Sequence, residues 1–90
     1  MAEAIARVTR NWSRVDDTLA LSEDTPQIVQ NSGNSPVWLF EGTSLPAAGF
    51  GESLNDGIQI VQPFAYFEVT LAAGDRLFAI GPNGESRLVY

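Results

Sequence analysis

The stretch IVQNSGNSPVWLFEG, residues 28–42, decides the fold class that we expect for this chain. Two apolar runs flank the segment NSGNS at 31–35, in which Gly and Asn tolerate the backbone angles of a reversal. This pattern predicts a β-hairpin with strands at 27–31 and 36–42 joined by a longer loop. The stretch carries no reactive chemistry, so it predicts architecture and not activity.

The second strand of that predicted hairpin is apolar on both faces. Val37 and Leu39 would face one way, and Trp38 and Phe40 would face the other. A strand with one wet face alternates apolar and polar side chains, so we expect this strand to be covered on both sides. One cover is the core of the domain, and the other is a neighbouring subunit or the N-terminal segment.

Turn-forming residues recur on both sides of the hairpin. The chain has five prolines and eight glycines, and short strands separated by such residues are typical of a sandwich or barrel. Apolar runs predict further strands at 58–62, 66–71, 76–80 and 87–90. We therefore expect an all-β protein, with residues 1–90 forming a single small antiparallel β-sandwich that is jelly-roll-like.

The N-terminal segment, residues 1–16, has features of both helix and strand. Its apolar residues recur at a helical spacing of three and four, but Val8 and Trp12 belong to the residue types that favour strands. We expect an extended N-terminal arm with a strand at about 7–15. A second short strand is predicted at 19–22.

Residues 43–57 form a loop that is longer than a simple connection requires in a domain of this size. Phe50 lies between Gly49 and Gly51 in this loop. The ring of Phe50 can either contact a partner or pack back onto the domain, and we favour packing.

The charge of the chain disfavours nucleic acid and membranes as partners. Eleven acidic residues stand against five basic residues, all of them arginine, which gives a net charge of −6. A protein that binds duplex DNA needs several cations against the phosphates, and an anionic membrane surface attracts basic segments. The chain also starts without the apolar segment of a signal peptide, and no apolar run approaches the roughly 20 residues that span a bilayer.

The composition also disfavours catalysis and metal binding. The chain has no Cys, His or Lys, so a Ser or Tyr nucleophile lacks its usual activating base. The acidic pairs at 16–17 and 23–24 lie in turn-like segments, where Asp caps backbone groups, and they lack the pattern of a calcium-binding loop. We expect no enzyme, no catalytic residue, no metal and no cofactor.

Carbohydrate binding is an alternative of a different class. Aromatic rings on a small β-sandwich can stack on sugars, and Trp12, Trp38 and Tyr66 are the available rings. Burial in the core or in a subunit interface is favoured, because aromatic side chains contribute so much apolar area.

Three segments, taken in order, resemble small β-rich virion structural proteins of tailed bacteriophages. The run IVQNSGNSPVWLFEG followed by Pro46 resembles a hairpin of these proteins, and RVTRNWSRVDDTLALSE at 7–23 resembles their N-terminal strand pair. The segment FEVTLAAGDRLFAIG at 67–81 resembles a later strand. Together the segments cover most of the chain. The matching positions are turn and core residues, so no functional residue is carried over.

This resemblance implies a non-enzymatic virion protein that is assembled in the cytoplasm of the bacterial host. Our preferred hypothesis is a capsid decoration, or cement, protein that binds the outer surface of the major capsid protein. The alternatives are a tail or fibre adaptor and a sugar-binding module for host recognition. The acidic charge favours the outside of a capsid over its DNA-filled interior.

A small sandwich without disulfides often gains stability from partners, so we also expect a homo-oligomer. The symmetry of capsids makes a trimer the simplest guess. The residues that we expect at the interface are Ile5, Arg7, Arg10, Trp12, Trp38, Phe40 and Phe50.

Overall fold

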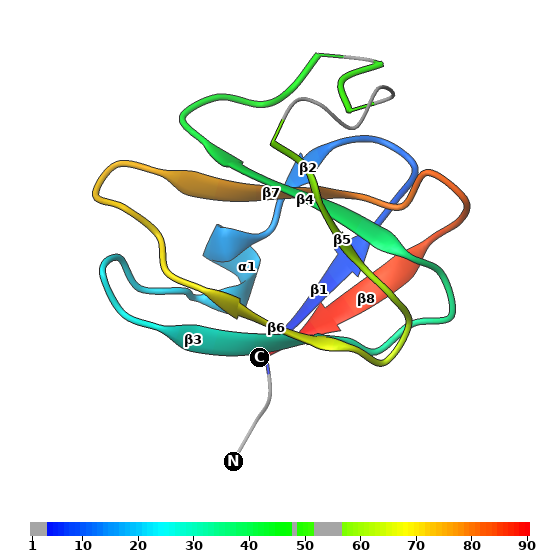
Figure 1. Cartoon of the computed structure of the whole chain (residues 1–90), viewed down its shortest axis with the longest axis horizontal. Helices are drawn as coiled ribbons and strands as arrows, with labels where there is room; N and C mark the ends of the chain where they lie inside the picture. Colours follow the sequence, from blue (N-terminus) through cyan, green and yellow to red (C-terminus); the bar gives the residue numbers. More distant parts are fainter. Residues whose placement is uncertain (1–3, 48, 52–56) are drawn as a thin grey trace.

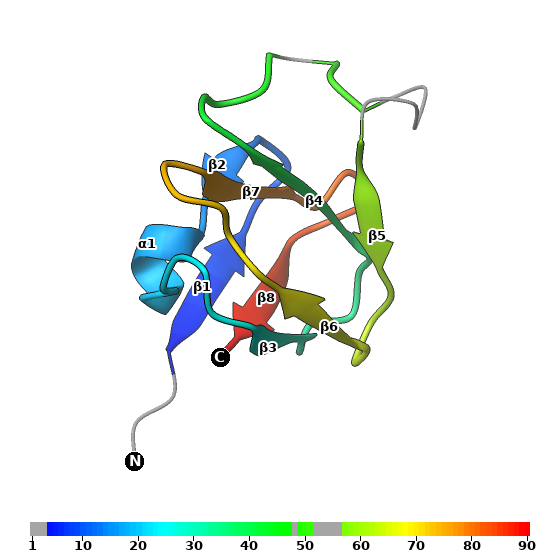
Figure 2. The same cartoon turned by 60° about the vertical axis from the view of Figure 1, so that its left-hand side comes forward.

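Two four-stranded antiparallel sheets pack face to face in the computed structural model, which describes residues 4–47, 49–51 and 57–90 (Figure 1). The first sheet contains β1 (Ile5–Val8), β8 (Ser86–Val89), β3 (Gln27–Asn31) and β6 (Tyr66–Val69), in that order. The second sheet contains β2 (Ser13–Arg14), β7 (Arg76–Ile80), β4 (Val37–Gly42) and β5 (Gln59–Val61). A short helix, α1 (Asp16–Leu19), lies at one side of the sandwich near β1 (Figure 2).

The strand order is that of a jelly roll. Consecutive strands lie in opposite sheets at every step except β4 to β5, which pair with each other. The resulting orders, β1-β8-β3-β6 and β2-β7-β4-β5, are those of two interleaved Greek keys. This arrangement confirms the all-β, jelly-roll-like sandwich expected from the sequence.

The predicted hairpin at 27–42 is wrong, although both of its strands exist. Strand β3 pairs with β6 and β8, whereas β4 pairs with β5 and β7 in the other sheet. The turn residues at 32–35 therefore carry the chain from one sheet to the other. A strand–turn–strand pattern is locally the same for a hairpin and for such a crossover, because the pairing partners lie far away in the sequence.

The expected N-terminal arm is corrected to two strands of the sandwich. Strand β1 pairs with β8, and β2 pairs with β7. Residues 1–3 of the expected arm lie outside the described residues. The strand predicted at 19–22 is replaced by the end of α1, whose first turn carries Asp16 and Asp17 at the favourable end of the helix dipole.

The hydrophobic core fills the space between the two sheets. Strand alternation supplies it: in β6, Phe67 and Val69 are buried and Tyr66 and Glu68 are exposed, as predicted. The largest of the fully buried apolar side chains are Val8, Val15, Leu19, Val29, Val37, Leu71 and Leu88. Burial of these side chains supplies most of the driving force for folding.

Candidate functional site

The crossover at residues 32–35 is held in place by the buried side chain of Asn31. Its Nδ2 donates hydrogen bonds to the carbonyl oxygens of Ser35 at 2.9 Å and Val61 at 3.1 Å. Its Oδ1 accepts hydrogen bonds from the Gly33 amide at 3.1 Å and the Ser86 hydroxyl at 2.7 Å. These four bonds satisfy the whole amide group, so the crossover is anchored to both sheets.

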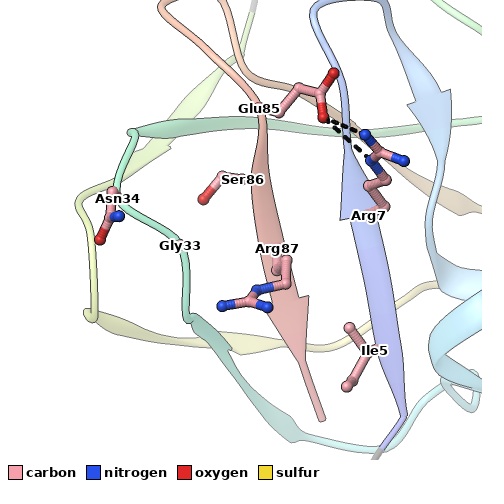
Figure 3. Close-up of a pocket in the computed structure, with 7 residues that line it drawn as sticks. All are labelled: Ile5, Arg7, Gly33, Asn34, Glu85, Ser86 and Arg87. Carbon is pink, nitrogen blue, oxygen red and sulfur yellow. Dashed lines mark hydrogen bonds and ion pairs between the residues drawn. The ribbon is translucent and has the colours of Figure 1, made fainter.

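Beside this crossover, a shallow hollow of about 370 Å³ opens on the outer side of the first sheet (Figure 3). The residues that line it are Ile5, Arg7, Gly33, Asn34, Glu85, Ser86 and Arg87. The crossover approaches β8 very closely here, because a Cβ added to Gly33 would lie 2.8 Å from the Cα of Ser86. One wall of the hollow thus depends on the absence of a side chain at Gly33.

Two arginines lie next to each other in the hollow. Arg7 of β1 and Arg87 of β8 are directly opposed in the strand pairing. Arg7 is neutralised by Glu85, whose Oε1 lies 2.6 Å from Nη2 and 3.1 Å from Nε of the guanidinium. The side chain of Arg87 has neither a hydrogen bond nor an ion pair within the part of the chain that the structure describes.

The hollow continues into an apolar surface on the same side of the first sheet. Ile5, Ile28 and Tyr66 keep 54%, 52% and 69% of their surface exposed. The register connects them, since Ile5 pairs with Val89, and Gln30 pairs with both Val89 and Tyr66. We call this surface the sheet face and define it as Ile5, Arg7, Ile28, Gln30, Tyr66, Glu68, Arg87 and Val89.

Phe64 lies in the turn just before β6 and borders the sheet face. Its backbone has a φ of 66°, and its side chain is 59% exposed. The Phe64 amide donates to the carbonyl of Asn31 at 2.6 Å, and the Phe64 carbonyl accepts from the Gln30 side chain at 3.1 Å. A bulky residue in the left-handed region carries strain, so these bonds hold an exposed ring in a costly conformation.

The outer side of the second sheet carries an aromatic cluster of three residues, Trp12, Phe40 and Phe50. The Phe50 ring meets Phe40 edge-on at a centroid distance of 4.8 Å, and it meets Trp12 in a similar way at 6.0 Å. Nε1 of Trp12 also donates to the Phe50 carbonyl at 3.4 Å. The favoured expectation that Phe50 packs back onto the domain is confirmed.

Trp38 lies beside this cluster and is covered by the same loop. A Cβ added to Gly51 would lie 3.3 Å from the Trp38 ring, so the loop backbone passes directly over the indole. The second cover expected for β4 therefore includes Phe50 and Gly51 of the loop, with Trp12 of the N-terminal segment packed against Phe50. Residues 48 and 52–56 of the predicted loop lie outside the described residues.

The structure places six of the seven expected interface residues on two opposite sides of the sandwich. Ile5 and Arg7 lie on the sheet face, and Arg10 is exposed between β1 and β2. The other four lie outside the second sheet, where Trp12 is 8% exposed and the rest are half-buried: Trp12, Trp38, Phe40 and Phe50.

Sequence reasoning missed Ile28, Phe64 and Arg87. Alternation in β8 makes Arg87 face outward while its neighbours Ser86 and Leu88 are buried. The outward direction of Arg87 could therefore have been predicted from the sequence. Its position beside Arg7 depends on the register between the first and last strands, which no local pattern provides.

The buried acid Asp16 has a structural role. Arg14 binds both oxygens of its carboxylate at 3.0 and 3.1 Å, and the Leu77 amide donates to Oδ1 at 3.1 Å. Burial alone raises the pKa of Asp16, but the hydrogen bonds from Arg14 and Leu77 outweigh it and hold the pKa below its ordinary value. The carboxylate thereby ties β2, α1 and β7 together.

Within residues 4–47, 49–51 and 57–90, no group of three or more acidic side chains is arranged to hold a metal ion. Nowhere in these ranges does a helix reach the length and apolarity needed to cross a membrane.

No protein-family model matches this chain, and no curated protein or solved structure is significantly similar to it. The fold and the surface therefore define this protein: it is a jelly-roll sandwich whose first sheet presents an exposed surface of apolar side chains and arginines.

Proposed function

We propose that this protein is a non-enzymatic structural protein of a phage particle. In this proposal it is a decoration protein that binds the outer surface of the major capsid protein through its sheet face. The observation that carries the proposal is the exposure of Ile5, Ile28 and Tyr66 on one side of so small a domain. Exposed apolar surface of this kind marks sites of protein interaction.

The assignment to a phage particle rests on the sequence resemblance and on analogy. Jelly rolls occur in viral capsid proteins, as well as in lectins and cupins, and one fold supports many functions. The net charge of −6 supports a position outside the capsid, away from packaged DNA.

The arrangement of the aromatic side chains also supports the use of the sheet face. The Phe50 ring packs against Trp12 and Phe40. More than half of the surface of Ile28 and of Tyr66, in contrast, is exposed. A partner therefore gains more buried apolar area at the sheet face than at the aromatic cluster.

Co-sedimentation with capsids assembled from the major capsid protein of the same genome tests the proposal. The protein should sediment with these capsids to saturation. The double variant Ile28→Asn/Tyr66→Ser should lose binding, while Ile60→Asn should retain it. Ile60 is a matched control because it is 40% exposed on the second sheet.

Each outcome decides between the alternatives. Failure of the wild-type protein to sediment with capsids overturns the decoration role, and sedimentation with isolated tails instead supports the tail or fibre adaptor. Equal binding by the double variant and the wild type rules out the sheet face. Light scattering of the free protein measures the proposed homo-oligomer, for which a trimer is expected.

Sugar binding is a second candidate because of Tyr66. Among the three rings proposed as platforms, Tyr66 is the most exposed, and it adjoins the amide of Gln30 and the carboxylate of Glu68. A glycan array followed by NMR titration tests this candidate. Saturable shifts at Tyr66 support it, and the absence of binding across the array rules it out for the sugars displayed.

A further inference from the structure

We propose that the hollow beside Arg87 receives the carboxylate of an Asp or Glu side chain from the protein partner. This inference rests on the proposed function, because it specifies the chemistry of the surface that docks on the sheet face. The partner would present an acidic side chain among apolar neighbours, so that the acid enters the hollow while the neighbours cover Ile5 and Ile28.

The hollow contains a directly opposed pair of like charges. Directly opposed residues of like charge destabilise an antiparallel pair, and Arg7 and Arg87 are opposed in this way. The chain has eleven acids for five arginines, yet among the described acids only Glu85 reaches this arginine pair. The two arginines and one glutamate leave a net charge of +1 in the hollow.

The Arg87 side chain is also placed to hold an anion. The Arg87 side chain extends from β8 toward the crossover and leaves its guanidinium in the hollow, while Arg7 turns toward Glu85 (Figure 3). The carbonyl of Arg87 accepts a 2.9 Å hydrogen bond from the Ser32 amide, which fixes the crossover against β8 at this point. A guanidinium held beside an open hollow can grip a carboxylate through two parallel hydrogen bonds.

The charge of the hollow and its apolar rim favour one kind of anion. One uncompensated positive charge matches a carboxylate, which is a monoanion. A nucleic acid backbone would meet the same arginines but also the repulsion of a chain with a net charge of −6. The apolar rim at Ile5 likewise suits a protein surface, in which an acid is surrounded by carbon.

NMR titration of the free, ¹⁵N-labelled protein tests the hollow without any capsid. The probes are two blocked tripeptides, acetyl-Leu-Glu-Leu-amide and acetyl-Leu-Gln-Leu-amide, with inorganic phosphate as a third. The glutamate peptide should shift the Arg87 Nε–H signal and the amide signals of Gly33 and Asn34 saturably. The glutamine peptide, and the Arg87→Gln variant with the glutamate peptide, should bind roughly tenfold more weakly.

The matched control is Arg76→Gln. Arg76 is exposed on the second sheet and also has no ion pair to a described residue, so this variant changes the net charge equally and should bind like the wild type. Equal shifts with both peptides, or shifts away from the hollow, overturn the inference. Tighter binding of phosphate than of the glutamate peptide assigns the hollow to phosphate and also overturns it.

The same variants in the capsid assay separate this inference from the proposed function. If the wild type and Arg87→Gln sediment equally with capsids, the role of the hollow is wrong and the decoration role stands. If the wild type ignores capsids but the glutamate peptide binds in the hollow, the decoration role is wrong and the carboxylate site stands.

Discussion

The hydroxyl of Ser86 donates a 2.7 Å hydrogen bond to Oδ1 of Asn31, and both side chains are buried. This bond joins β8 to the last residue of β3. The same amide reaches the carbonyl of Val61 in the opposite sheet. One side chain therefore connects the two layers at the point where the chain crosses between them.

Replacing Asn31 should be one of the most damaging polar substitutions in the molecule. Asn31→Ala leaves several buried polar groups without a partner, and each costs about 1–3 kcal/mol. We expect the free energy of unfolding, measured by urea denaturation, to fall by about 3 kcal/mol or more. Ser86→Ala is the matched comparison, because it removes one bond and should cost about 1 kcal/mol. Equal losses in the two variants would contradict this account.

Phe64→Asn should stabilise the domain. Phe64 has a φ of 66°, and Asn adopts this region more easily, so relief of strain should raise the free energy of unfolding by about 1 kcal/mol. Tyr66→Asn is the control: Tyr66 is similarly exposed but lies in an extended strand, where Asn is unfavourable. Denaturation of both variants provides the measurement. Destabilisation by Phe64→Asn would show that the ring contributes more than its conformation costs.

Phe50→Ala should uncover the aromatic cluster without unfolding the sandwich. Phe50 contacts Phe40 and Trp12 and accepts a hydrogen bond from the indole through its backbone. Loss of the ring should lower the free energy of unfolding by about 2 kcal/mol, less than for a fully buried Phe. Tryptophan fluorescence should shift to longer wavelength as Trp12 becomes hydrated. An unchanged emission spectrum would argue against the packing of Phe50 on Trp12.

Glu41 and Asp16 should affect the pH dependence of stability in opposite directions. Burial raises the pKa of Glu41, its interaction with Asp75 adds to this, and the Ala72 amide opposes it. The folded state thus favours protonated Glu41, and this contribution is lost as the pH rises above about 4. The pKa of Asp16 is lowered, so its contribution is present above about pH 4 and is lost at lower pH.

Two variants test the direction of these two pH dependences. Glu41→Gln should be relatively more stable at pH 7 than at pH 3, when each measurement is compared with the wild type at the same pH. Asp16→Asn should show the reverse, with its largest loss at pH 7. Urea denaturation at both pH values provides the comparison, and a Glu41→Gln difference that does not depend on pH would contradict the raised pKa.

The sequence predicted the strands better than their partners. The boundaries of β3 and β7 match the predicted segments, and alternation placed Phe67 and Val69 inward. Local patterns could not show that β3 and β4 lie in different sheets. The strands that pair with β3 are β6 and β8, which are distant from it in the chain. Helix α1 was missed because a single turn is too short for a clear periodicity.

Only part of the candidate site could be predicted from the sequence. Ile5 and Arg7 were singled out, and both lie on the sheet face. The hollow depends on the opposition of Arg7 and Arg87, which are eighty positions apart, and on the close approach of Gly33 to Ser86. Both are products of tertiary register, to which a pattern read along the chain has no access.

The place of β8 between β1 and β3 has a consequence for the order of folding. During synthesis β1 stays unpaired until β8 has left the ribosome, because no other described strand lies next to β1 in its sheet. Long-range pairing of this kind slows folding. The hollow therefore stays incomplete on any nascent intermediate that lacks β8, because Arg7 has no Arg87 opposite to it until β8 pairs with β1.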